Sequence, residues 1–181
     1  MRVITGTARG RKLNAPAGLE TRPTTELVKE AVFSTIQFEI EGAVVLDLFA
    51  GSGQMGLEAL SRGAKLCTFV DNAKQSQSVI RDNLERTGLS QNSRIVAMEA
   101  SAFLKNASGS IDIAFVDPPY QKGLIKKLLD PLAAVMRSSG IIICETDRSE
   151  IMPETAGSFK KHKAYRYGKT MITVYRGSTE E

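Results

Sequence analysis

The sequence contains no tryptophan, one histidine and two cysteines, and these shortages exclude several kinds of site. A single imidazole, His162, leaves neither a metal cluster nor a Ser-His-Asp triad with the side chains that it needs. We therefore expect no bound metal and no hydrolase of the triad kind. Cys67 and Cys144 each lie inside an apolar run, which predicts buried, reduced thiols.

Long hydrophobic runs are missing as well. No apolar run reaches the roughly 18 residues that cross a bilayer, and the first residues carry no apolar signal-peptide core. We therefore expect a cytoplasmic protein with no membrane partner, and a monomer because no apolar surface stripe is evident. The length of 181 residues, with 42% hydrophobic and 24% charged residues, is typical of one globular domain.

The whole chain has a net charge of +4. Two basic stretches near its ends contain no acidic residue. Two basic clusters around a balanced middle indicate a polyanionic partner such as a nucleic acid. On charge alone, a solvated surface is an equally good explanation. The two stretches contain Arg2, Arg9, Arg11 and Lys12, and then Lys160, Lys161, Lys163, Arg166 and Lys169.

Apolar runs alternate with helical patterns along the middle of the chain. We expect buried strands at residues 43–48, 65–70, 94–98, 111–116 and 140–145, with helices between them, one of which ends at Gly88. This alternation predicts βαβ units and a doubly wound, mostly parallel α/β sheet. Between the last two strands, Asp130 and Pro131 could cap and open a second helical piece.

Both ends of the chain depart from this alternation. Residues 158–176 hold two strand-like runs around Gly168 and Lys169, which predicts a β-hairpin and an antiparallel pair at the end of the sheet. Residues 2–13 alternate in polarity and predict a small hairpin, followed by a helix that Thr24 or Thr25 could cap. We divide the chain into a basic hairpin extension at residues 1–22 and a larger domain at residues 23–181.

Candidate ligand-binding residues follow the first three predicted strands, where doubly wound sheets bind their ligands. Gly51, Gly53 and Gly56 form G-x-G-x-x-G between a strand and a helix, where backbone must approach a ligand closely. Asp71 ends the second strand, where an acid can accept hydrogen bonds from both ribose hydroxyls of an adenosine. Glu99 follows the third, near the expected adenine position. Alone, the glycines fit a simple tight turn, and Glu99 an ordinary exposed carboxylate.

Asp47, just before the glycines, distinguishes between two kinds of cofactor. In dinucleotide-binding sites this loop contacts an anionic pyrophosphate, which would repel a neighbouring carboxylate. The cationic amino and sulfonium groups of S-adenosylmethionine would suit the carboxylate instead. The sequence therefore favours S-adenosylmethionine over NAD.

The fourth strand runs into Asp117, Pro118, Pro119 and Tyr120. An exocyclic amine of a nucleobase is a poor nucleophile, because its lone pair is delocalised into the ring. A carboxylate and a backbone carbonyl that accept its two N–H hydrogens would localise that lone pair. The prolines hold these acceptors rigidly, and the tyrosine offers a face on which a base can stack. This pattern predicts methyl transfer to a base amine without a metal.

Several segments resemble a known family. DLFAGSG (47–53), an acidic strand end and VDPPY (116–120) resemble class I S-adenosylmethionine-dependent amino-methyltransferases. Together with RPTT (22–25), SRGA (61–64) and YGKTMITVY (167–175), they resemble the bacterial enzymes that methylate guanine N2 in 16S ribosomal RNA. The resemblance implies a seven-stranded Rossmann-like sheet with a reversed last strand. It also implies a substrate that is ribosomal RNA or an assembling small ribosomal subunit.

The resemblance assigns roles to individual residues. Many relatives have glutamate in place of Asp71 and aspartate or asparagine in place of Glu99, so the backbone of Ala100 is a second candidate for the adenine contact. The implied cofactor-binding residues are Arg22, Thr24, Asp47, Phe49, Gly51, Gly53, Asp71, Asn72, Glu99, Ala100 and Asp117, and the implied catalytic residues are Asp117, Pro118, Pro119 and Tyr120. From the charge pattern, we expect RNA contacts at Arg9, Arg11, Lys12, Lys160, Lys161, Lys163 and Lys169.

Other functions stay open. DNA adenine-N6 methyltransferases share D-P-P-Y but usually carry an additional target-recognition segment, for which this chain has no room. Methyltransferases of glutamine side chains favour asparagine at the first position and an additional N-terminal domain. Two alternatives belong to other classes: an NAD-dependent oxidoreductase, which Asp47 and D-P-P-Y argue against, and a non-catalytic nucleic-acid-binding module, which the intact motifs argue against only weakly.

Overall fold

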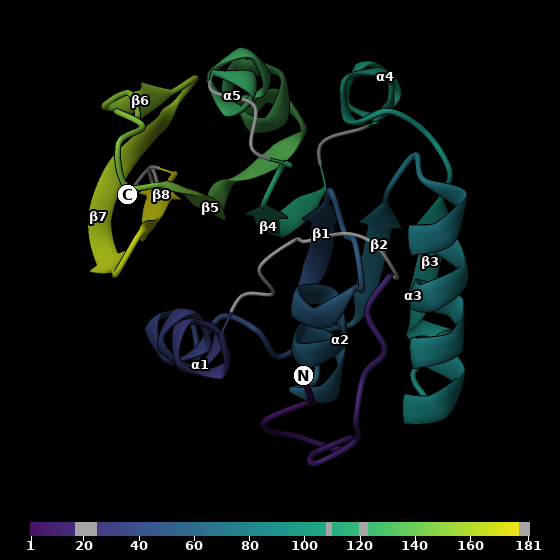
Figure 1. Ribbon diagram of the computed structural model, residues 1–181. Coiled ribbons are helices and arrows are strands. Elements are labelled where there is room, and N and C mark those ends of the chain that lie inside the picture. Colours follow the sequence, from purple (N-terminus) through teal and green to yellow (C-terminus); the bar gives the residue numbers. More distant parts are fainter. Residues whose placement is uncertain (17–24, 108–109, 120–122, 178–181) are drawn as a thin grey trace.

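A mixed sheet of eight strands forms the centre of the protein in the computed structural model, which describes residues 1–16, 25–107, 110–119 and 123–177 (Figure 1). The strand order is β3-β2-β1-β4-β5-β8-β7-β6. The parallel strands are Val44–Leu48 (β1), Leu66–Val70 (β2), Ser93–Val96 (β3), Ile111–Val116 (β4) and Met136–Asp147 (β5). The antiparallel strands are Thr155–Ala156 (β6), Phe159–Tyr167 (β7) and Thr170–Arg176 (β8).

Helices cover both faces of the sheet (Figure 1). One face packs against Glu26–Thr35 (α1), Gln54–Ser61 (α2) and Lys74–Thr87 (α3). The other packs against Ala100–Asn106 (α4) and Leu124–Val135 (α5). A short 3-10 helix, Ser90–Asn92, precedes β3. This is the doubly wound arrangement that the alternation of apolar runs predicts.

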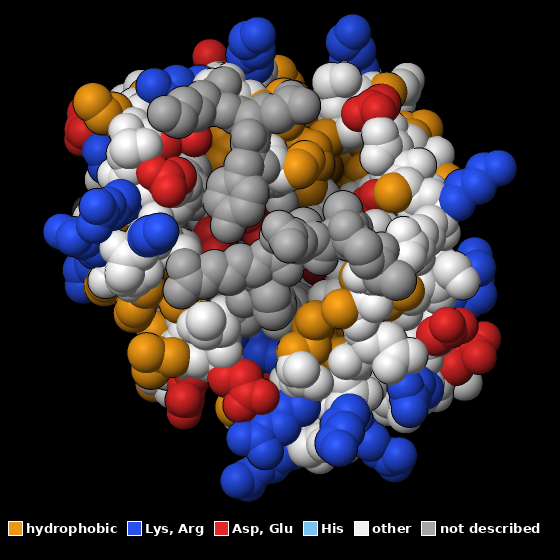
Figure 2. All heavy atoms as spheres, viewed as in Figure 1, with side chains coloured by type: hydrophobic (Ala, Val, Ile, Leu, Met, Phe, Trp, Pro, Cys, Tyr) orange, Lys and Arg blue, Asp and Glu red, His pale blue; other side chains and the backbone are white. Residues whose placement is uncertain are grey.

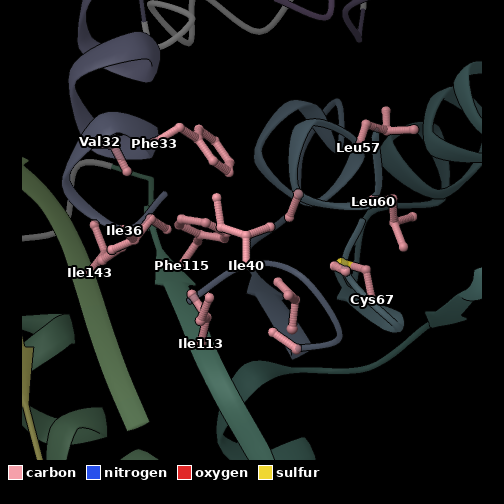
Figure 3. Close-up of a cluster of buried hydrophobic side chains, with 14 of the residues drawn as sticks. Val32, Phe33, Ile36, Ile40, Leu57, Leu60, Cys67, Ile113, Phe115 and Ile143 are labelled. Carbon is pink, nitrogen blue, oxygen red and sulfur yellow. The ribbon is translucent and has the colours of Figure 1, made fainter. Parts of the chain in front are cut away.

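The core beneath α1 and α2 fixes which strand residues face these helices. In Figure 3, Phe33 of α1 and Ile36, which follows the helix, lie next to Phe115 of β4 and Ile143 of β5. The Phe33 and Phe115 ring centroids are 5.4 Å apart. Successive strand residues point to opposite faces. Continuing the alternation to the carboxyl ends of four adjacent strands places four acidic residues on the same face as this core: Asp47, Asp71, Asp117 and Glu145.

The predicted antiparallel end of the sheet is confirmed. β8 inserts between β5 and β7 and pairs antiparallel with both, and the β7–β8 turn contains Gly168 with a φ of 60°. The sheet has one strand more than the expected seven because the two-residue β6 pairs with the start of β7. Gly88 ends α3 in a left-handed conformation, as its position predicts, and its N–H donates to the Glu85 and Leu84 carbonyls.

A single helix replaces the two helical pieces predicted around Asp130 and Pro131. α5 continues through Pro131, so the prediction of a second piece is wrong. A proline inside a helix removes one backbone hydrogen bond and costs about 3 kcal/mol. The helix buries several apolar side chains against the sheet, among them Leu128, Leu129 and Leu132, and each contributes roughly 1.5–3 kcal/mol. This burial outweighs the cost of the proline.

The N-terminal residues form the expected small hairpin, closed by the backbone bridge between Arg2 and Lys12. Its backbone N–H groups at Ile4 and Thr5 donate to the buried carboxylate of Glu58, at 2.8 and 2.9 Å. The same carboxylate forms an ion pair with Lys29 of α1, whose ammonium is fully buried and donates to the Arg2 carbonyl. Burial lowers the pKa of Lys29, and the Glu58 charge partly offsets this effect. The hairpin is thereby attached to α1 and α2.

Both cysteines are buried free thiols, as predicted. Within the described residues, no helix is long and apolar enough to cross a bilayer, and no group of three or more potential ligand side chains could hold a metal ion.

Candidate active site

The glycine-rich loop turns the chain sharply from β1 into α2. Phe49, Gly51 and Gly53 all have positive φ values, of 68°, 56° and 76°. The motif glycines serve different purposes. A Cβ on Gly56 would lie 2.3 Å from Phe69 Cε1, so this glycine allows α2 to pack on the sheet. A Cβ on Gly51 would meet no atom closer than 4.0 Å, so its backbone faces open space rather than protein.

Asp71 supports the glycine loop from the end of β2. One oxygen, Oδ2, accepts a hydrogen bond from the Gly51 backbone N–H at 2.9 Å, and Oδ1 accepts one from Ala73 N–H at 2.9 Å. A carboxylate has about four acceptor positions, so both oxygens retain capacity for a ligand hydroxyl. The half-buried side chain therefore both fixes the loop and remains able to bind.

Asp47 is buried beneath the loop, with 4% of its surface exposed. Its Oδ2 accepts a hydrogen bond from Gly56 N–H at 2.9 Å. Burial raises its pKa to about 7, the Gly56 hydrogen bond opposes the shift, and the charge of Asp71 adds to it. A cation close to this carboxylate would stabilise its ionised form.

Asp117 follows β4, which is the neighbour of β1 in the sheet. Asp47 of β1 pairs with Phe115, two residues before Asp117. The residue as a whole is exposed, but its carboxyl group lies among enough protein atoms that burial raises its pKa well above the usual range. The charges of Glu145 and then Asp47 add to this effect. Pro118 is half-buried and Pro119 exposed. Tyr120 lies outside the described residues, as do Arg22 and Thr24.

Three further predicted residues gather beyond β2 and β3. β3 ends at Val96, so Glu99 does not end the strand but directly precedes α4. The Asn72 amide donates a hydrogen bond to Glu99 Oε1, which joins the β2 and β3 ends. Ala100 is buried as the first residue of α4. The structure therefore brings these residues to the same edge of the sheet as Asp71.

A further set of residues, which no sequence motif indicates, supports the glycine loop. Asn83 of α3 donates to the carbonyls of Ser52 and Asn14, both at 3.0 Å, and accepts a hydrogen bond from Asn14 N–H at 2.8 Å. This buried side chain thus attaches the N-terminal segment to the glycine loop. A fully buried asparagine on an otherwise polar helix has no sequence signal that distinguishes it from its exposed neighbours.

The structure separates the predicted RNA-binding residues into different regions. Lys169 lies in the β7–β8 turn, where its carbonyl accepts a hydrogen bond from Arg148 N–H at 2.8 Å, beside the carboxyl end of β5. Lys160 and Lys161 lie at the other end of β7, opposite Arg176 and Tyr175, and Lys161 forms an ion pair with Glu154. Lys163 is in the middle of β7.

The N-terminal basic residues form a third region. Residues 7 and 8 donate to Ser61 at the carboxyl end of α2, so the hairpin turn that includes Arg9 and Arg11 lies at the opposite end of α2 from the glycine loop. Lys12 lies on the returning strand of this hairpin. In Figure 2, lysine and arginine side chains surround this face of the molecule, while acidic side chains are visible between the grey residues near its centre.

Comparisons with known proteins show the family to which this chain belongs. The family model described as "Conserved hypothetical protein 95" matches residues 1–176. "Putative rRNA methyltransferase YlbH" of Bacillus subtilis (strain 168) is 38% identical over 97% of this chain and 98% of its own length. "Ribosomal RNA small subunit methyltransferase D" of Escherichia coli (strain K12) is 33% identical over 97% of this chain and 89% of its own length.

The fold has equally similar counterparts among solved structures. The structure of "Putative methyltransferase yhhF from Escherichia coli" has a TM-score of 0.89 and 33% identity, and covers 99% of each chain. The similarity thus includes the sheet, both helix layers and the N-terminal hairpin. On these matches, the chain belongs to the Conserved hypothetical protein 95 family, whose relatives here carry the names of ribosomal RNA methyltransferases.

Proposed function

We propose that this protein transfers a methyl group from S-adenosylmethionine to the exocyclic N2 amine of a guanine in 16S ribosomal RNA. The observation that carries the proposal is the placement of Asp47, Asp71 and Asp117 at the carboxyl ends of adjacent strands and on one face of the sheet. The names of both relatives support methyl transfer to ribosomal RNA, and the name of the Escherichia coli relative supports the small subunit. The guanine-N2 target comes from the sequence resemblance and from the chemistry of D-P-P-Y.

The residues present fit S-adenosylmethionine. The open space above Gly51 admits a ligand against the backbone, and Asp71 keeps acceptor capacity for the ribose hydroxyls. Asp47 would hold the cationic methionine end, which would relieve the cost of its buried charge. The adenine would lie against Asn72, Glu99 and the backbone of Ala100. We assign Phe49, Gly53 and Asp117 to the same site, with Arg22 and Thr24 completing it.

The bound cofactor would supply an electrophilic methyl group and retain the electron pair of the broken sulfur–carbon bond. Asp117 would accept a hydrogen bond from one N2–H hydrogen, and the Pro118 carbonyl one from the other. This arrangement localises the N2 lone pair toward the methyl group and holds the amine in line for transfer. The methylated ammonium then loses one proton to water. Pro119 keeps the segment rigid, and Tyr120 would stack on the base.

The RNA would be held through its phosphates. Basic residues of the proposed N-terminal extension at residues 1–22, and those of β7 in the proposed domain at residues 23–181, would position the substrate without specifying its sequence. The predicted contacts are Arg9, Arg11, Lys12, Lys160, Lys161, Lys163 and Lys169. We propose that the protein acts as a monomer in the cytoplasm, on free ribosomal RNA or on an assembling small subunit.

A labelling experiment tests the function. The purified protein is incubated with S-adenosylmethionine labelled on the methyl group and with 16S RNA or assembling small subunits from cells that lack the enzyme. DNA of matched length serves as the control substrate. One portion of the product is digested to nucleosides and separated, which identifies the modified nucleoside, and another portion is cut with a base-specific ribonuclease so that the labelled oligonucleotide locates its position.

We expect the label in N2-methylguanine from the ribosomal substrate and none in DNA. Label in DNA N6-methyladenine would instead support the alternative adenine methyltransferase. Thermal stabilisation by NAD, with none by S-adenosylmethionine, would support an oxidoreductase, because a ligand that binds only the folded state raises Tm. Either result would overturn the proposed function.

A further inference from the structure

Glu145 lies beside Asp117 at the proposed site, although no sequence motif identifies it. The β4–β5 register pairs Phe115 with Ile143 and Val116 with Cys144. One further step along both strands places Asp117 next to Glu145, and paired residues of neighbouring parallel strands lie about 4.8 Å apart. Phe115 and Ile143 both belong to the core beneath α1, so the alternation puts both carboxylates on that same face.

The electrostatics agree with this proximity. Among charged neighbours, Glu145 contributes most to the raised pKa of Asp117, ahead of Asp47. Glu145 is half-buried, and within the described residues neither Asp47 nor Asp117 forms an ion pair with a lysine or arginine. Adjacent carboxylates repel each other, so such a pair is favoured by a ligand that presents two or more hydrogen-bond donors to it.

We propose that Glu145 determines specificity for guanine by accepting a hydrogen bond from its N1–H while Asp117 accepts one from its N2 amine. This inference rests on the proposed function. The Watson–Crick edge of guanine presents N1–H and the N2 amine side by side, and both are donors. Adenine presents an N1 acceptor, whose lone pair would face the Glu145 carboxylate without a hydrogen. A donor-rich edge therefore fits the carboxylate pair, and an adenine edge is rejected.

Wild-type selectivity gives the first test. An RNA spanning the nucleotide located by the labelling experiment is prepared with guanine or 2,6-diaminopurine at that position, and assembled with small-subunit proteins if labelling required them. Diaminopurine keeps the N2 amine but replaces N1–H with an acceptor. We expect kcat/KM to favour guanine by at least about 100-fold, because Glu145 would lose its donor and face an acceptor lone pair instead. Equal values for the two substrates would overturn the proposal.

Glu145→Gln gives the second test. The amide can donate to the N1 acceptor of diaminopurine, so we expect the guanine-to-diaminopurine ratio of kcat/KM to fall by at least about tenfold. A purely structural role of Glu145 would lower both rates without changing their ratio. The matched control is Glu154→Gln, the same chemical change on the segment between β5 and β6, where the carboxylate pairs with Lys161. This variant should keep the wild-type ratio.

Two measurements separate this inference from the proposed function. The melting temperature and the affinity for S-adenosylhomocysteine should be similar in wild type and Glu145→Gln, which would show that the variant folds and keeps its cofactor site. Methylation of guanine N2 with an unchanged ratio in Glu145→Gln would overturn only the role of Glu145. If wild type transfers no methyl group to guanine N2, the proposed function fails, and this inference fails with it.

Discussion

The backbone N–H of Gly51 donates a hydrogen bond to Asp71 Oδ2 at 2.9 Å and so joins the ends of β1 and β2 across 20 residues of chain. The glycine loop and the proposed ribose-binding carboxylate are therefore one unit. A ligand that binds Asp71 also meets the backbone of the loop, in an orientation that is set before binding.

Asp71→Ala should chiefly weaken cofactor binding. The change removes the proposed acceptor of the ribose hydroxyls and the two hydrogen bonds that hold Gly51 and Ala73. Hydrogen bonds to a charged group contribute about 1.5–3 kcal/mol each, so we expect the Kd for S-adenosylhomocysteine to rise at least about tenfold in calorimetry. Asp82→Ala, an exposed position on α3, is the control. Unchanged affinity in Asp71→Ala would remove this residue from the site.

Gly51→Ala should lose cofactor affinity with only a small loss of stability. Gly42 gives a matched control, because both glycines have positive φ, 56° and 74°, and a Cβ at either would contact no protein atom closer than 4.0 Å. Each alanine variant should cost about 1–2 kcal/mol of unfolding free energy through backbone strain. Only the Cβ at position 51 would occupy the ligand space. Equal cofactor affinity in the two variants would show that the open space at Gly51 is not the binding site.

The alternation of apolar runs predicted the doubly wound sheet, and the hairpin pattern around Gly168 predicted its antiparallel end. The strand ends and their motifs predicted the positions of Asp47, Asp71 and Asp117. These features depend on local periodicity and on short motifs. Glu145 was missed because its role depends on the pairing of β4 with β5, which brings together residues far apart in the chain. The same reason applies to Asn83, whose contacts with Ser52 and Asn14 are set by tertiary packing.

The prediction that a second helical piece begins at Asp130 and Pro131 was wrong, because burial of the helix face outweighed the local preference of these residue types for a helix start. Asp130 and Pro131 have the residue types of a helix start, but the apolar face of α5 continues past them against the sheet. The positions of the basic residues in the fold were also not predictable from local sequence. Their clustering in sequence did not predict that Lys160 and Lys169 would lie at opposite ends of β7.

The raised pKa of Asp47 makes stability and binding depend on pH in opposite directions. Its pKa is about 7 in the folded protein, above its ordinary value of 3.8, so the folded state binds more protons between these values. Stability of the free protein should therefore fall as pH rises through 7, by about 2–3 kcal/mol from pH 5 to 8. The raised pKa of Asp117 acts in the same direction. Affinity for S-adenosylmethionine should increase over the same range, because its cation prefers ionised carboxylates.

Asp47→Asn is the variant that tests this dependence. Urea denaturation at pH 5 and 8 should show a smaller loss of stability in the variant than in wild type. Calorimetry should show weaker binding of S-adenosylmethionine at pH 8, with less change between the two pH values. A variant that retains the full wild-type pH dependence of both quantities would exclude Asp47 as the titrating group.

RNA affinity should depend more on the β7–β8 turn than on the far end of β7. Arg148 and Lys169 meet beside the proposed site, whereas Lys160 is about 23 Å away along the strand. We expect Arg148→Ala and Lys169→Ala each to reduce the slope of log K against log salt by about 1, and Lys160→Ala to reduce it less. Filter binding at several salt concentrations gives the slopes. An unchanged slope in the Arg148→Ala/Lys169→Ala double variant would place the RNA elsewhere.

Asp117→Ala should lower kcat strongly while the cofactor still binds. The carboxylate is the proposed acceptor for the N2 amine, and loss of one such preorganised partner costs roughly 100- to 1000-fold in kcat. Affinity for S-adenosylhomocysteine should fall less than in Asp71→Ala, because Asp47 and Asp71 remain. Asp117→Asn keeps one carbonyl oxygen in place, so we expect part of the lost kcat to return.

Single-turnover methyl transfer measures the chemical step directly in all three proteins. An order of wild type, then Asp117→Asn, then Asp117→Ala would support an acceptor role, because it follows the acceptor strength of the side chain rather than its size. Near-normal turnover in Asp117→Ala would mean that the amine finds its acceptor elsewhere. In that case the neighbouring carboxylate of Glu145, on the same face of the sheet, would be the first residue to replace.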